Sequence, residues 1–113
     1  MNWALLLVTA LVGALTWIGI AYPGLSAAKG WPAGDWARSD NWQIGFWIGV
    51  AATLVSGYCH GQILGVLVTI AGTGVLAFAI AESVGPGVQL PARIGGALAV
   101  PWMLLSILIA IRA

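Results

Sequence analysis

Charged residues are scarce in this chain of 113 residues. Four basic and three acidic side chains make up 6% of the sequence, whereas apolar residues make up 61%. A soluble globular domain has about 25% charged residues, so water is not the main solvent of this protein. The few basic residues form no patch that could neutralise a run of phosphates, which argues against nucleic-acid binding. The composition predicts an integral membrane protein.

Residues that carry chemistry are also scarce. Cys59 is the one cysteine and His60 the one histidine, so neither an internal disulfide nor a complete zinc, iron or haem site can form within one copy. His60 could give a porphyrin-type pigment one axial bond, although a turn histidine facing lipid headgroups is the commoner arrangement. No phosphate-binding loop, dinucleotide fingerprint or HExxH motif is present. We therefore expect no catalysis by this chain alone and no encoded cofactor, with lipid or pigment contact left open.

Four apolar runs divide the chain, over residues 3–22, 42–58, 62–82 and 92–111. At about 1.5 Å per residue, a helix of about 20 residues matches the ~30 Å hydrocarbon core of a bilayer. One straight helix over residues 42–81 would be about twice that thickness, so the chain must reverse within it. We expect an all-α integral membrane protein, a single domain over residues 1–113, with four transmembrane helices in a compact bundle joined by short loops.

Proline and glycine mark where these helices should end. Pro23 and Gly24 should stop the first helix, because proline cannot supply the backbone donor that a continuing helix needs. The glycines and polar groups of residues 57–61 predict a tight turn, and the proline-rich and glycine-rich residues 83–91 predict a loop. Pro101 lies inside the last run, where it predicts a kink.

Tryptophan is abundant near the ends of the predicted helices. Its ring is apolar but its indole N–H needs a polar partner, which favours the interface between lipid and water. The segment from Pro32 to Arg38 could form a short interfacial helix in the first loop. The expected interfacial anchors are Trp3, Trp31, Trp36, Trp42, Trp102 and, as a snorkelling cation, Arg112.

Small residues recur in steps of four along the second and third predicted helices. The run is Gly45, Gly49, Thr53, Gly57, Gly61, Gly65, Thr69, Thr73, Ala77 and Ala81. Steps of four place side chains on one ridge of a helix, and small ridges let backbones approach closely in lipid. We predict tight packing along this small-residue ridge, either within the chain or against a partner chain.

Three polar residues are candidates for a polar or ligand contact: Glu82, His60 and Arg93. An ionisable group near a membrane span marks function by default, because burying an unpaired charge in hydrocarbon costs several kcal/mol. Glu82 lies at the end of the third predicted helix. It could be an interfacial carboxylate that is solvated by water or paired with Arg93, a proton or cation site, or a contact with a partner.

Two functions remain open from the sequence. The favoured one is a small accessory or structural subunit of a larger membrane complex, respiratory or photosynthetic, surrounded by lipids and other integral membrane subunits. The alternative is a homo-oligomeric transporter or channel with its pathway between subunits, lined by Thr53, Thr69 and Thr73 and with Glu82 at a mouth. For either function we expect the bacterial cytoplasmic (inner) membrane as the location.

Overall fold

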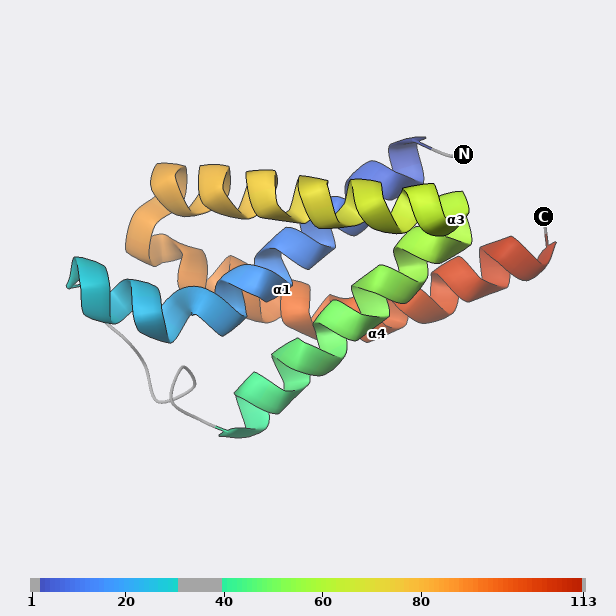
Figure 1. The fold of residues 1–113 in the computed structure, drawn as a ribbon. Helices are drawn as coiled ribbons and strands as arrows, with labels where there is room; N and C mark the ends of the chain where they lie inside the picture. Colours follow the sequence, from blue (N-terminus) through green and yellow to red (C-terminus); the bar gives the residue numbers. More distant parts are fainter. Residues whose placement is uncertain (1–2, 31–39, 113) are drawn as a thin grey trace.

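Three α-helices make up almost all of the described chain. The structure is a computed structural model that describes residues 3–30 and 40–112. Helix α1 covers Trp3–Lys29, α3 covers Asp40–Val84 and α4 covers Gln89–Arg112, with a short 3-10 helix η1, Gly85–Val88, between α3 and α4 (Figure 1). All three α-helices are long and apolar enough to cross a membrane.

The predicted count of four transmembrane helices is wrong. Residues 42–58 and 62–82 belong to one element, the 45-residue helix α3, whose backbone leaves helical geometry at Gln62 (φ 56°, ψ −140°). The predicted turn at residues 57–61 is helical, and the bend comes one residue later. Lipid offers no partner to a free backbone group, so a helix that bends at a single residue keeps more of its hydrogen bonds than a five-residue turn would.

The bend divides α3 into a first arm, residues 40–61, and a second arm, residues 63–84. Figure 1 shows the two arms meeting at the bend and diverging from it, with both chain termini at the same end of the molecule as the bend. Beside the bend, a Cβ built on Gly65 would collide with the backbone carbonyl of Gly57. Only glycine at these two positions lets the arms approach backbone to backbone.

Helix α1 does not stop at Pro23, as the sequence predicts, but continues to Lys29. A proline inside a helix leaves the carbonyl four residues earlier without its usual donor, here that of Gly19. The side chain of Gln43 reaches that carbonyl from α3, with Nε2 3.5 Å from the oxygen. Ser26 donates a hydrogen bond from Oγ to the Pro23 carbonyl at 3.0 Å. Two side chains, those of Gln43 and Ser26, thus donate hydrogen bonds to backbone carbonyls where the helix continues past Pro23.

The connection to α4 is shorter than the predicted loop over residues 83–91. Helix η1 follows α3 directly, and α4 begins at Gln89. Gly85 has a φ of 69°, which glycine adopts without a steric penalty. Pro91 lies in the first turn of α4, where proline is tolerated, and α4 continues through Pro101. The predicted interfacial helix over residues 32–38 lies outside the described residues.

The largest buried side chains gather toward the end of the molecule away from the bend. The core cluster there contains Ala14, Ile18, Tyr22, Phe46, Ala77, Val88 and Ala92. Phe46 fills a slot between α1 and α4, because a Cβ on Gly19 or Gly96 would collide with its ring. Glycine on both neighbouring helices therefore makes room for one aromatic ring.

Candidate functional site

The small-residue ridge lies mostly inside the molecule. It is buried at Gly49, Thr53, Gly57, Gly65, Thr69, Ala77 and Ala81, intermediate at Gly61 and Thr73, and exposed at Gly45. At Gly49 a Cβ would lie 2.9 Å from Cγ2 of Thr16 and 3.2 Å from Cβ of Ala99, so the ridge touches both α1 and α4 there. A Cβ on Gly45 would meet no atom within 4 Å. Much of the ridge is thus used for packing within the chain.

The threonines of the ridge satisfy their hydroxyl groups locally at two positions. Thr53 and Thr69 donate hydrogen bonds to the carbonyls of Gly49 and Gly65, each at 2.8 Å. Such bonds back to the preceding turn let a hydroxyl lie in an apolar interior without a partner from another helix. They also hold the proton of each hydroxyl, so only the oxygen lone pairs remain for another contact.

A pocket of about 320 Å³ lies between α1 and the two arms of α3. It is lined by Gly13, Trp17, Val50, Thr53, Leu54, Thr69, Ile70, Thr73 and Gly74. Thr53, Thr69 and Thr73, which the transporter hypothesis puts on a pathway between subunits, therefore line a space within one chain. None of the lining residues is ionisable, so the pocket is an uncharged, mainly apolar site.

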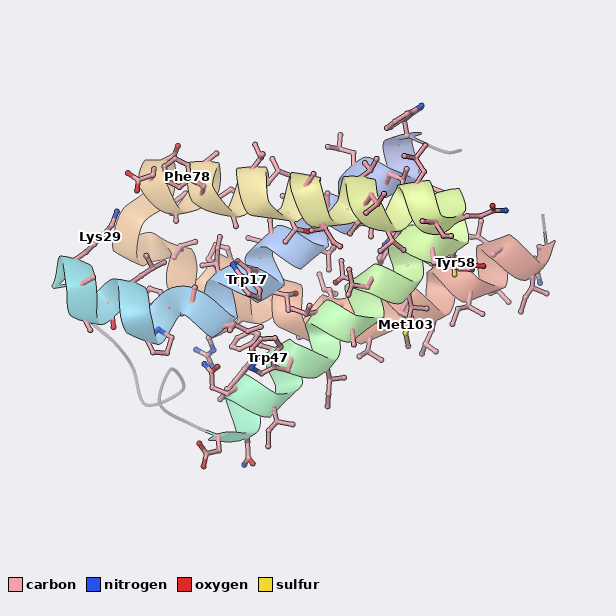
Figure 2. The ribbon with its side chains drawn as sticks, viewed as in Figure 1. Trp17, Lys29, Trp47, Tyr58, Phe78 and Met103 are labelled. Carbon is pink, nitrogen blue, oxygen red and sulfur yellow. The ribbon has the colours of Figure 1, made fainter. Side chains whose placement is uncertain are left out.

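Two tryptophans inside the helices lie beside this pocket. Trp17 of α1 and Trp47 of the first arm meet edge to face, with ring centroids 6.0 Å apart and planes at 90° (Figure 2). This geometry is the favoured arrangement of two aromatic rings and adds to the stabilisation from burial alone. Trp17 also lines the pocket, so the pair fixes one side of it.

His60 is buried beside the bend. Its Nε2 lies 2.9 Å from Oγ of Ser106 on α4, which is itself fully buried. One ring nitrogen of His60, Nε2, is therefore engaged within the chain. The pair ties the bend of α3 to α4, and neither group would be satisfied in hydrocarbon without the other.

Trp102 forms a second polar contact between helices next to His60. Its Nε1 donates to Oγ1 of Thr9 at 2.8 Å, and Thr9 donates onward to the carbonyl of Leu5 at 2.8 Å. The ring of Trp102 lies 6.0 Å from that of His60. The indole N–H predicted to anchor Trp102 at the interface is thus used inside the bundle.

The remaining charged candidates lie at the opposite end from the bend. Glu82 forms an ion pair with Lys29, with Oε1 and Nζ 2.9 Å apart, and both side chains are substantially exposed. The guanidinium of Arg93 lies over the ring of Trp42, 4.9 Å from its centroid. Both contacts lie at the end of the molecule where η1 connects α3 to α4, called the loop end below. Lys29 reaches the end of α3 there, and Trp42 near the start of α3 meets Arg93 near the start of α4.

Apart from Trp102, the predicted interfacial anchors fall into three groups. Trp3 and Arg112 lie exposed at the outer ends of α1 and α4. Trp42 lies near the start of α3 and packs on Phe46, with ring centroids 5.7 Å apart. Trp31 and Trp36 lie outside the described residues.

Several residues of the site carry no recognisable signal in the sequence. Ser106 and Lys29 find their partners 46 and 53 positions away, and no local pattern predicts either pairing. Gly13 and Trp17 could have been suspected, because both interrupt an otherwise aliphatic run near its middle. The ten-residue ridge identifies one face of α3 but not the face of α1 that packs against it.

These features define a helical membrane protein with an uncharged, half-open pocket between α1 and the two arms of α3. Comparison with known proteins finds no matching family model, curated protein or solved structure.

Proposed function

We propose that this chain is a small, non-catalytic subunit of a larger membrane protein complex. The observation that carries the proposal is the uneven burial of its three helices. The buried share of the most apolar stretch is 44% in α1, but only 17% in α3 and 17% in α4. Helix α1 is the most buried of the three, whereas α3 and α4 present broad apolar faces that lipid or neighbouring helices would cover.

The second arm of α3 offers the surface best suited to a partner helix. Leu67, Val75 and Phe78 are exposed on it, Phe78 by 71% of its surface. Figure 2 shows Phe78 on this arm, near the loop end of the molecule. Aromatic side chains are enriched among the residues that anchor protein interfaces.

The proposal includes the absence of independent catalysis. Within residues 3–30 and 40–112, no three His, Cys, Asp or Glu side chains come together as a metal site would require. Threonine and serine side chains of the bundle donate to carbonyls of their own helix, as Thr53 and Ser56 do, and His60 pairs with Ser106. We place the complex in the bacterial cytoplasmic membrane, with respiratory and photosynthetic assemblies as the classes that use such subunits.

Purification of the tagged chain from its native membrane in mild detergent tests this function. We expect unlike integral membrane proteins to co-purify in a fixed ratio. Replacing Phe78 by Ala should reduce their recovery severalfold, whereas the control Leu108→Ala on α4 should not. A stable, monodisperse monomer without any partner would contradict the proposal.

A second function is favoured by the pocket. Transporter sites often lie near the middle of the bilayer, and this pocket lies near the middle of α1 and of both arms of α3. The pocket between α1 and the two arms of α3 gathers Thr53, Thr69 and Thr73, as the alternative of a homo-oligomeric transporter or channel uses them. Several identical copies around one axis, together with a flux that Glu82→Gln alters in vesicles, would favour this function over the accessory role.

A further inference from the structure

The pocket between α1 and the two arms of α3 lies near the middle of all three segments. Gly13 and Trp17 are on either side of the midpoint of α1, which covers Trp3–Lys29. Val50 and Leu54 lie near the middle of the first arm, and Gly74 near the middle of the second. In a bilayer this depth is the hydrocarbon core, so what enters the pocket is already dissolved in lipid.

The lining of the pocket selects for an uncharged molecule. Its walls are Trp17, the aliphatic side chains of Val50, Leu54 and Ile70, two glycines and three threonines. A charged ligand at this depth would need an opposite charge or a ring of polar groups, and the lining supplies neither.

The threonine hydroxyls favour binding of a molecule with a polar group over binding of a lipid acyl chain. Thr53 and Thr69 donate their protons to their own helix. Thr73 instead places Oγ1 against the backbone of Gly13, only 2.6 Å from where a Cβ would be, and makes no hydrogen bond to another described residue. A hydroxyl in hydrocarbon gains from any partner, and the end of an acyl chain has none to offer.

The size of the pocket sets the size of the occupant. At about 320 Å³ it is about twice the ~150 Å³ apolar cavity that accommodates benzene, and at the lower end of the ~300–1,000 Å³ range of ligand pockets. We propose that this pocket binds an uncharged lipophilic molecule of about two rings that carries one carbonyl or hydroxyl group. The rings contact Trp17 and the aliphatic walls, and the polar group bonds to the hydroxyl of Thr73.

Benzophenone is a suitable probe because it has two aromatic rings and one carbonyl, is uncharged, and attaches to nearby C–H bonds when irradiated. We expect saturable labelling of the purified chain in detergent, with attachment sites on α1 and on both arms of α3 around the pocket. Diphenylmethane has the same rings without the carbonyl, so it should compete about two- to tenfold more weakly than unlabelled benzophenone. This comparison uses the unaltered chain and does not depend on any variant folding.

Three variants, one of them a control, locate the site. Gly74 lines the pocket and a Cβ there would meet no atom within 4 Å, so Gly74→Leu should fit and reduce labelling at least tenfold. Gly45→Leu is the matched control, because Gly45 is equally open but does not line the pocket, and its labelling should be unchanged. Thr73→Val should weaken binding about two- to tenfold. Labelling that does not saturate, or that spreads over the outer faces of α3 and α4, would overturn the proposal. So would equal competition by unlabelled benzophenone and diphenylmethane.

Discussion

The two arms of α3 touch beside the bend and leave a pocket further along. Near the bend, Gly57 and Gly65 bring two backbones into contact, with no room for a Cβ on either. At mid-height, the same ridge continues with Thr53 on one arm and Thr73 on the other, and the space between the arms and α1 amounts to about 320 Å³. The residue spacing is the same in both regions, so spacing alone does not decide how closely two helices approach. The divergence of the arms from Gln62 decides it (Figure 1).

Away from the bend, the largest effect is expected where an aromatic ring fills the space between neighbouring helices. Phe46 fills the slot between Gly19 and Gly96, and its side chain is 1% exposed. Phe46→Ala should lower the free energy of unfolding by about 3 kcal/mol, because glycine on both sides cannot fill the cavity. Denaturation in mixed micelles measures the loss. The exposed Phe78→Ala is the control, and an equal effect of both changes would show that the slot does not carry this stability.

At the bend, the contact between α3 and α4 can be removed without changing side-chain volume greatly. Ser106→Ala leaves Nε2 of the buried His60 without its partner, which should cost about 1–3 kcal/mol of unfolding free energy. Ser83→Ala, at an exposed serine near the end of the second arm, is the control and should change the free energy of unfolding by less than about 0.5 kcal/mol. If His60→Phe combined with Ser106→Ala were no more stable than Ser106→Ala alone, the cost would not come from the unpaired ring nitrogen.

The bend itself should be improvable. Gln62 has a φ of 56°, a region that residues with a Cβ rarely adopt and that glycine adopts freely. Gln62→Gly should therefore raise the free energy of unfolding by about 1 kcal/mol, after the entropy that glycine adds to the unfolded chain. Thermal unfolding in detergent would record the gain, and a loss of stability of similar size would place the bend elsewhere in α3.

At the loop end the smallest effect is expected. The ion pair between Lys29 and Glu82 joins two exposed side chains, and exposed pairs contribute about 0–1 kcal/mol. Glu82→Gln should thus change unfolding by less than about 1 kcal/mol, and the difference should shrink as salt is added. A larger, salt-independent effect would mean that Glu82 is buried by a partner or has a role in transport.

The sequence predicted the class of the fold, helices long and apolar enough to cross a membrane, better than it predicted the number of helices. Uncharged runs correctly indicate a helical membrane protein, since hydrocarbon tolerates little else. The count failed because the difference between two helices and one bent helix rests on the backbone angles of Gln62, which composition does not encode. The end of α1 was misplaced because the continuation past Pro23 involves Gln43, a donor from another helix.

The candidate site was only partly predictable for the same reason. A spacing of four identifies which residues share a ridge, and it identified the threonines that line the pocket. It does not identify what faces them, so Gly13 and Trp17 on α1 and Ser106 on α4 were missed. Partners far apart in sequence become visible only when the helices are assembled.

Leucine substitution at two glycines of the same ridge would test most directly whether backbone contact beside the bend holds the helices together. Gly65→Leu must collide with the backbone of Gly57, whereas Gly45→Leu enters open space. We predict that unfolding in bicelles becomes easier by more than about 3 kcal/mol for Gly65→Leu and by less than about 1 kcal/mol for Gly45→Leu. Equal losses at the two positions, or none at Gly65, would contradict the packing of α3 described above.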